Sequence, residues 1–178
     1  NYSVTVTDAN RCSATASVTI TEPQQLALAS MPASTPVDCH GNATGTASFT
    51  LQGGTTPYSV TLNGETKIGD DNTFFFDFDS LKAGTYTATI KDDNNCELTD
   101  VSVTITEPAA LQLSITDTSS LCYDKADGYI NYTFSGGTPD YTVSIPGKNN
   151  SHIAVGSGSF TDLADGSYTV TVTDTNEI

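Results

Sequence analysis

Blocks of residues recur along this 178-residue chain at nearly constant spacing. Residues 2–8, 86–92 and 168–174 each begin with Tyr and end with Asp, and they are offset by 84 and 82 positions. The block Val-Thr-Ile-Thr-Glu-Pro occupies residues 18–23 and occurs again at 103–108, 85 positions later. A regular period of this kind is the signature of an array of similar structural units, so it constrains the architecture before any single residue does.

A third block agrees with the same period. Residues 51–58 and 134–141 both contain Gly-Gly followed by Thr, Pro and Tyr, at an offset of 83. The repeating unit is therefore about 84 residues long, enough to bury a small core of its own, unlike a short solenoid repeat. Counted from the Glu-Pro pairs, the sequence predicts the C-terminal hairpin of a preceding module at 1–23 and a complete module at 24–108. It predicts a following module without its last strand at 109–178, and we expect the chain to be part of a longer array.

Alternating apolar residues within each unit predict short β-strands. Thr, Val, Ile and aromatic residues fit a pleated, half-buried surface, and no stretch repeats apolar residues at helical spacing over three turns. The residues expected to define the strands of the complete module are Leu26, Leu28, Ala47, Phe49, Leu51, Tyr58, Val60, Leu62, Phe74 to Phe78, Tyr86, Ala88, Ile90, Val103 and Ile105. Six or seven such strands form a two-sheet sandwich, so the predicted fold class is all-β, with tandem immunoglobulin-like β-sandwich modules.

Two recurring loop motifs favour the same fold. Gly53-Gly54 and Gly136-Gly137 allow backbone conformations with positive φ. A Leu-x-x-Gly-x-Tyr motif ends at Tyr86 and again at Tyr168. A glycine turn before an inward Tyr resembles the tyrosine corner of immunoglobulin-like sandwiches, in which the hydroxyl bonds to nearby backbone. We expect both tyrosines to be structural corners, the alternative being an ordinary core tyrosine.

The charge of the chain excludes some classes of partner. Its formal net charge is −15, with only six Lys and Arg residues. Such a surface repels phosphate backbones and anionic membranes, and no apolar run is long enough to span a bilayer. We therefore expect neither nucleic-acid binding nor membrane insertion.

The motifs together resemble a known family. The string from Gly84 to Cys96, with Thr-Ile-Thr-Glu-Pro108 after it, is similar to the SprB repeat, and so is Cys39-His-Gly41 followed by Gly53-Gly54. The resemblance covers nearly the whole chain. The family pattern usually has Gly before the second Cys, where this chain has Arg11 and Asn95, and it often has a Trp that this chain lacks.

The resemblance implies a location and a role. SprB repeats occur in very long surface proteins of Bacteroidota, including a gliding-motility adhesin, and these proteins are exported by the type IX secretion system. The chain is accordingly expected to be an extracellular, cell-surface stalk segment of a large adhesin, acting as a spacer or filament. Its partners would be neighbouring modules of the same chain and, at the surface, polysaccharide or other surface proteins.

Four cysteines occur, none of them in a Cys-x-x-Cys pair, which argues against a zinc site. Cys39 and Cys96 belong to the complete module, and an exported location permits a disulfide between them. Closing that loop would stabilise the fold by roughly 4 kcal/mol. In an immunoglobulin strand order, however, the two loops lie at opposite poles. Cys39 would then face the last hairpin of the following module, where Ile178 takes the cysteine position. We favour the bridge within the module.

Acidic and amide residues gather where modules are predicted to meet. Calcium binds several hard oxygen ligands of this kind, and an ion at each junction would stiffen the array. The candidate ligands are Glu22, Asp92, Asp93, Asn94, Glu107, Asp174 and Asn176. The other interpretation is ordinary turn chemistry without a metal, because Asp and Asn bond their own backbone in tight turns.

No catalytic site is expected. His40 beside Cys39 resembles half of a nucleophile–base pair, but no orienting partner is apparent. His152 does not recur, whereas every other notable feature does, and a catalytic group normally occurs once in a site unlike its scaffold. We predict that the chain is not an enzyme and needs no cofactor other than possible calcium.

Two further surface features are open to interpretation. A glycan- or ligand-binding module is the competing hypothesis, and Phe75, Tyr123 and Tyr129 are its candidates for exposed aromatic residues. The tripeptide Asp79-Ser80-Leu81 resembles the O-glycosylation motif of Bacteroidota, with Ser80 as the acceptor.

Overall fold

The computed structural model describes residues 1–119, 125–153 and 156–176. All regular secondary structure in these ranges is β-strand, in antiparallel sheets, and none is helix. The prediction of an all-β, immunoglobulin-like sandwich fold is confirmed. Within the same ranges there is accordingly no helix long and apolar enough to cross a membrane.

The strands are short and follow one another closely along the chain. Their bounds are β1 Tyr2–Thr7, β2 Ser13–Val18, β3 Ala27–Leu28, β4 Ala33–Thr35, β5 Gly45–Gln52, β6 Ser59–Leu62, β7 Glu65–Ile68, β8 Phe75–Leu81, β9 Gly84–Lys91, β10 Glu97–Ile105, β11 Gln112–Ser119, β12 Gly128–Ser135, β13 Tyr141–Ile145, β14 Lys148–Ile153, β15 Ser157–Leu163 and β16 Thr171–Thr173.

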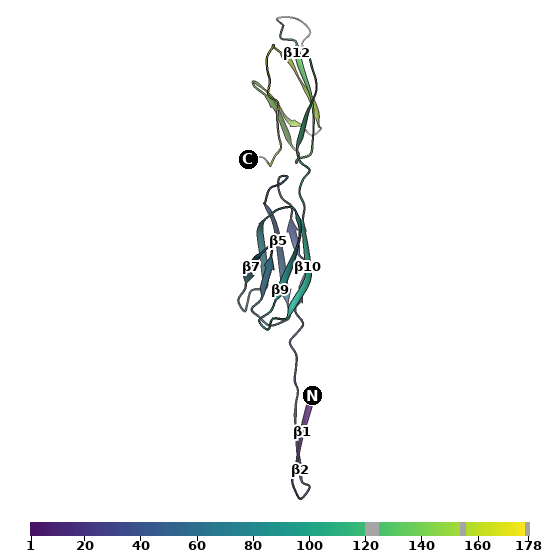
Figure 1. Ribbon diagram of the computed structural model, residues 1–178, viewed down its shortest axis with the longest axis vertical. Helices are drawn as coiled ribbons and strands as arrows, with labels where there is room; N and C mark the ends of the chain where they lie inside the picture. Colours follow the sequence, from purple (N-terminus) through teal and green to yellow (C-terminus); the bar gives the residue numbers. More distant parts are fainter. Residues whose placement is uncertain (120–124, 154–155, 177–178) are drawn as a thin grey trace. The chain divides into compact units, whose positions relative to one another are not determined.

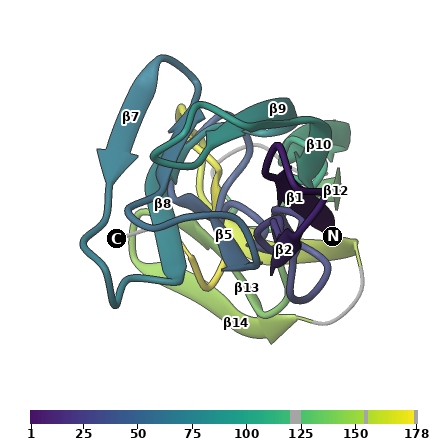
Figure 2. The same ribbon diagram turned by 90° about the horizontal axis from the view of Figure 1, so that it is seen from below.

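The sheets repeat one pattern. The first copy has a sheet in the order β10-β9-β6-β7 and a second in which β5 pairs with β3, β4 and β8. The second copy has the orders β14-β13-β16 and β11-β12-β15. β9 and β10 run side by side in Figure 1, and β7 is the peripheral edge strand in Figure 2. By sequence offset, β12 to β16 are therefore the counterparts of β5 to β9.

The chain divides into two compact units. The first contains residues 1–31, 50–76 and 88–101, and the second contains residues 32–49, 77–87 and 102–178. This division differs from the one drawn from the repeat, so the module boundaries at Pro23 and Pro108 stay a prediction.

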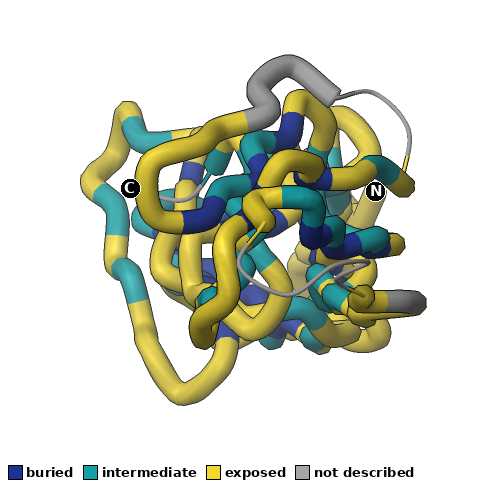
Figure 3. Tube along the Cα trace, turned by 90° about the horizontal axis from the view of Figure 1, so that it is seen from above, coloured by how far each residue is buried: buried dark blue, intermediate teal, exposed yellow. Residues whose placement is uncertain are grey.

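Alternation along each strand decides what is buried. In β5 every second residue from Gly45 to Leu51 is buried, and β13 has the same alternation. Figure 3 shows buried residues in dark blue recurring between half-buried and exposed ones along the trace. Phe49 and Phe78 meet edge to face with their ring centroids 6.0 Å apart. Fully burying one such side chain contributes about 1.5–3 kcal/mol.

The aromatic run at 74–78 is only partly inward. Phe76 and Phe78 are buried, while Phe74 and Phe75 are exposed. Phe75 is exposed and Phe76 is buried because successive residues of a β-strand point to opposite faces of the sheet. Phe74 precedes β8, and its ring contacts that of Tyr58 at 5.9 Å between centroids.

The β1–β2 hairpin is exposed on both faces. Its strands pair from Tyr2 opposite Val18 to Thr7 opposite Ser13. Every residue of the two strands is exposed, including the apolar row of Tyr2, Val4 and Val6. Their sequence counterparts in β9 include Ala88 and Ile90, which are buried.

Candidate functional site

The turn between β9 and β10 is built around one buried carboxylate. Asp92 Oδ1 accepts the backbone N–H of Cys96 at 2.8 Å, and Asp92 Oδ2 accepts that of Thr55 at 3.0 Å. Burial by itself raises the pKa of Asp92. The backbone N–H groups of Thr55, Cys96 and Asn94 outweigh that effect, so the pKa lies below its ordinary value. Asp92 is thus an ionised structural anchor between two loops.

The same carboxylate occurs in the other two copies of the block. Asp8 accepts the N–H groups of Asn10 and Cys12 at 2.9 and 2.8 Å. Asp174 accepts those of Asn176 and Thr138 at 3.2 and 2.7 Å. The motif that looked like cation-binding chemistry in the sequence therefore serves the turn of each copy.

The paired glycines make room for this arrangement. Gly54 has φ +65°, and a Cβ there would lie 3.0 Å from Asp92 Oδ2. Its backbone N–H donates to the carbonyl of Gln24 at 2.6 Å. Gly137 repeats both features. A Cβ there would lie 2.8 Å from Asp174 Oδ2, and its backbone N–H donates to the Ala109 carbonyl at 2.7 Å. The sequence indicated only a turn at these positions. The structure adds that Gly54 and Gly137 must lack a side chain because the carboxylates of Asp92 and Asp174 approach them so closely.

The first group of predicted calcium ligands does not form a metal centre. Glu22, Asp92 and Asn94 all line one hollow in the first unit. The carboxylate of Asp92 is nevertheless occupied by N–H donors, and the Asn94 amide donates to the Thr55 hydroxyl at 2.9 Å. Asp93 is exposed beside them, and its backbone N–H donates to the Thr55 carbonyl. The positive ends of backbone dipoles at this carboxylate disfavour a cation.

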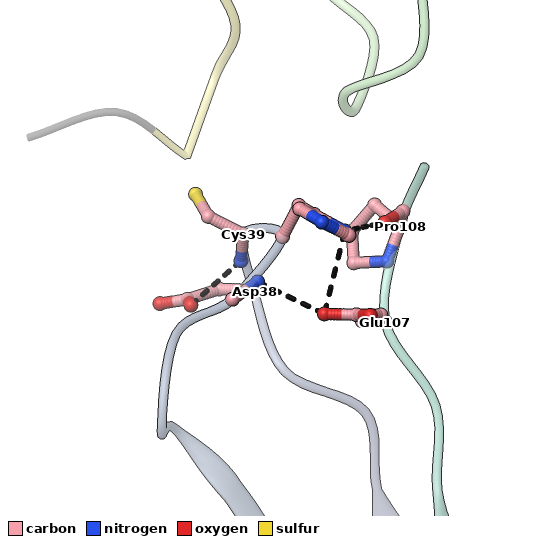
Figure 4. Close-up of polar contacts among 6 residues, drawn as sticks. Asp38, Cys39, Glu107 and Pro108 are labelled. Atoms are coloured by element: carbon pink, nitrogen blue, oxygen red, sulfur yellow. Dashed lines mark hydrogen bonds and ion pairs between the residues drawn. The ribbon is translucent and has the colours of Figure 1, made fainter. Parts of the chain in front are cut away.

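The second group is likewise engaged elsewhere. Glu107 Oε2 accepts the backbone N–H of Gly41 at 2.9 Å and lies 3.4 Å from His40 Nδ1 (Figure 4). Asp174 accepts backbone N–H groups, and the Asn176 amide donates to the Asp38 carbonyl at 2.9 Å. Nowhere in the described ranges do three His, Cys, Asp or Glu side chains converge in a way that could hold a metal ion.

The loop from Asp38 to Thr44 is held by its first residue. Asp38 Oδ1 accepts the Thr44 hydroxyl at 2.6 Å and the Cys39 N–H at 2.7 Å (Figure 4 shows the latter). These donors, with the Asn42 amide, lower the pKa of Asp38. Sequence reasoning missed this role, although an Asp followed by Thr six residues later was a usable signal.

The predicted disulfide between Cys39 and Cys96 is not formed. Cys96 is a free, exposed thiol. The Cys39 thiol instead donates a hydrogen bond to the Asn176 carbonyl oxygen, at 3.4 Å from Sγ. Cys96 directly precedes β10, while the Cys39 loop bonds to Glu107, just after β10. The nine residues of that strand span about 30 Å at roughly 3.3 Å each, whereas a disulfide needs Cα atoms within about 7 Å. The alternative, in which Cys39 faces the last hairpin of the following copy, is the arrangement observed.

Both predicted corner tyrosines bond to backbone four residues upstream. The Tyr86 hydroxyl donates to the Lys82 carbonyl at 3.0 Å, and the Tyr168 hydroxyl donates to the Ala164 carbonyl at 2.9 Å. A second pair went unnoticed in the sequence: the hydroxyls of Tyr58 and Tyr141 donate to the carbonyls of Gly53 and Gly136. Each copy therefore ties two loops through tyrosine hydroxyls.

The remaining predicted positions are surface features. His40 Nδ1 lies 3.2 Å from the Pro108 carbonyl oxygen and 3.4 Å from Glu107 Oε2. The Cys39 thiol points away from Glu107 (Figure 4). Ser80 is exposed, and its hydroxyl donates to Asp79 at 2.9 Å. Phe75 is 56% exposed and Tyr129 is half-buried. Tyr123 and the side chain of His152 lie outside the described residues.

Comparison with known proteins adds no relative. No known protein family matches the chain, and no curated protein matches it.

Proposed function

We propose that the chain is a repetitive spacer or stalk segment of a large, secreted cell-surface adhesin. The observation that carries this proposal is the recurrence of its side-chain bonds. The Asp92–Thr55, Tyr86–Lys82 and Tyr58–Gly53 contacts each have a counterpart in the second copy. Interactions that recur with the fold stabilise the fold, whereas a binding or catalytic site is normally a departure from it.

The surface supports the same role. A net charge of −15 keeps neighbouring segments soluble and apart. The resemblance to SprB repeats supports display on the cell surface and export by type IX secretion, with neighbouring modules, surface polysaccharide or surface proteins as partners. In this proposal the chain holds an adhesive region away from the cell and catalyses no reaction.

Pulling single molecules of the full chain tests the proposal. A load-bearing module of about 84 residues should unfold in one step that lengthens the chain by roughly 250 Å. The same protein should show no saturable binding on a glycan array. Gradual extension without a discrete step would contradict the spacer.

Exposed aromatic residues favour one second candidate, a glycan-binding module. Phe75 is 56% and Phe74 is 44% exposed, and aromatic faces can stack on sugar rings. Saturable binding on the array that Phe75→Ala abolishes and Thr66→Ala preserves would support this candidate over the spacer. Absence of binding by the unmodified chain would reject it.

A further inference from the structure

The first copy has an open strand edge whose outer face carries an aromatic ring and two carboxylates. β8 pairs with β5, and no strand pairs with its other side in the ranges that the structure describes. Every second residue from Phe75 onward is exposed, so Phe75, Asp77 and Asp79 lie on one outward face. An unpaired edge presents backbone N–H and C=O groups to which another strand can bond.

The equivalent strand of the second copy has the same edge with different side chains. β15 is the counterpart of β8 at an offset of 82 residues, and it too pairs with one strand, β12. Its three outward positions hold Ser157, Ser159 and Thr161, all of them exposed. Exposure of this face is therefore a property of the repeat, whereas the aromatic ring and the carboxylates belong to the first copy.

The charge of the two equivalent segments differs in sign. Residues 65–79, from the start of β7 into β8, contain five carboxylates and one lysine, which gives a formal charge of −4. The counterpart segment, residues 148–161, contains one lysine and no carboxylate, which gives +1. The fold does not require acidic residues at this edge, because the second copy forms the same strands without them.

The second copy shows which chemical group binds beside this edge. Lys148 Nζ donates to the carbonyl oxygens of Thr161 and Asp162, the latter at 3.3 Å. An ammonium group thus caps the backbone at the end of β15. Glu65 is the counterpart of Lys148, since each opens the second strand of its hairpin after a glycine. An ionised carboxylate has no proton to donate, so Glu65 cannot supply that ammonium in the first copy.

Charge also decides which kind of partner fits the edge of β8. A second copy of this chain has a net charge of −15 and the same acidic edge, so two β8 strands repel each other. A strand with Lys or Arg at alternate positions is complementary, because side chains on one face repeat every second residue in both strands. Opposite charges across such a pair attract, and a cation can also lie on the ring face of Phe75.

We infer that the open edge of β8 binds an extended, basic segment of a partner protein, which joins the sheet as an additional strand. Backbone groups of the segment bond to β8, and its alternate cationic side chains meet Asp77 and Asp79. One further ammonium takes the place that the Lys148 ammonium holds in the second copy. This site does not depend on the proposed spacer function.

A simpler role for the carboxylates makes the opposite prediction. Charged residues on an edge strand prevent it from pairing with other copies of the same chain. If that were their whole role, replacing Asp77 and Asp79 would promote self-association, and the parent chain would have no particular affinity for a basic strand. Binding measurements on the full chain separate the two roles.

The probe is a fluorescein-labelled peptide, Thr-Lys-Val-Lys-Val-Lys-Thr, followed by anisotropy. We expect saturable binding that weakens as salt rises, and that falls about tenfold when Asp77→Asn and Asp79→Asn are combined. Combining Glu22→Gln with Asp93→Asn removes two exposed charges elsewhere and should leave binding unchanged. No saturable binding, or an equal loss in the two double variants, would overturn the inference. Urea unfolding verifies that both variants are folded.

A peptide of the same composition in blocks, Lys-Lys-Lys-Val-Val-Thr-Thr, separates strand pairing from net attraction. Its lysines cannot all lie on one face of a strand, so it should bind more weakly by about tenfold. Equal affinity of the two peptides would show attraction by charge alone and would overturn the added strand.

Glu65→Lys tests the place of the further ammonium. The new side chain should cap the edge from within, as Lys148 does, and should weaken binding of the alternating peptide more than Glu22→Lys does. Both substitutions change the net charge equally, so equal effects on binding would overturn the role of this place.

Amide hydrogen exchange locates the bound peptide, with β15 as a control in the same molecule. The alternating peptide should slow exchange in residues 75–81 and leave residues 157–163 unchanged. Equal protection of the two strands, or none in β8, would overturn the assignment to this edge. The single-molecule unfolding step expected of a spacer should be the same in the Asp77→Asn, Asp79→Asn protein, so failure of this inference and failure of the spacer function are distinguishable.

Discussion

The carboxylate of Asp92 accepts the backbone N–H of Thr55 at 3.0 Å and so ties the β9–β10 turn to the loop after β5. Asp174 and Thr138 make the same contact in the second copy. The acidic residues at these turns are therefore part of the folding chemistry of the repeat. This relationship leads to specific expectations for stability, pH and metal ions.

Replacing Asp92 with Asn should destabilise the first sandwich by about 1–3 kcal/mol. The amide has one acceptor oxygen, so either the Thr55 or the Cys96 N–H loses its partner. Urea unfolding gives the stability change, and amide hydrogen exchange at those two residues shows where protection is lost. Asp93→Asn is the control, because Asp93 is exposed. Equal stabilities of the two variants would contradict the anchoring role.

Acid should weaken the fold through the same carboxylate. The pKa of Asp92 is lower in the folded state than its ordinary value of 3.8. Its stabilising contribution is therefore complete above the unfolded value and is lost as pH falls through the lower folded value. Urea titrations from neutral pH down to strongly acidic pH should show a loss of stability that is smaller in Asp92→Asn. An identical pH dependence in the variant would assign the acid sensitivity to other groups.

The tyrosine corners should each stabilise their own copy. Tyr86→Phe removes the bond to the Lys82 carbonyl and should cost about 1 kcal/mol. Tyr2→Phe is a matched control at the equivalent position of the exposed hairpin, where the side chain is 64% exposed, and should change nothing measurable. Chemical denaturation of both variants measures the change in the free energy of unfolding. A Tyr86→Phe protein as stable as the parent would show that the Tyr86 hydroxyl bond does not stabilise the fold.

Calcium removal should leave the thermal midpoint unchanged. The candidate ligands Asp92 and Asp174 already accept backbone N–H groups. Differential scanning calorimetry with excess chelator and with added calcium measures the effect. A midpoint that rises with calcium but not with magnesium, and that Glu22→Gln lowers, would restore the junction site predicted from the sequence.

Cys96 should react rapidly with a maleimide in the folded chain, because its thiol is free and exposed. Cys39 is partly buried and donates to a carbonyl, so it should react more slowly. Mass spectrometry of labelled peptides reports both rates. Recovery of a peptide pair joined through Cys39 and Cys96 from protein purified without reductant would contradict the structure.

Much of the strand architecture was predictable because it depends on local periodicity. Ala47, Phe49 and Leu51 alternate in the sequence and are all buried. The equivalence of Tyr86 and Tyr168 was likewise visible from their shared Leu and Gly neighbours, and both hydroxyls bond to backbone. Phe75 and Phe76 were harder, since five residues with four Phe do not show where the alternation begins.

The amino-acid sequence by itself determined the period of the repeat, because matching blocks about 84 residues apart can be compared directly. It also determined the inward faces of the strands and the turn positions, because these depend on neighbours one to five residues apart. Only the tertiary structure decided which distant groups the loop residues contact. It placed backbone N–H donors at Asp92, joined Glu107 to Gly41, and separated Cys39 from Cys96 by the length of β10. Such contacts depend on strand register and loop path over many residues, and a residue's type does not reveal which distant backbone group it will face.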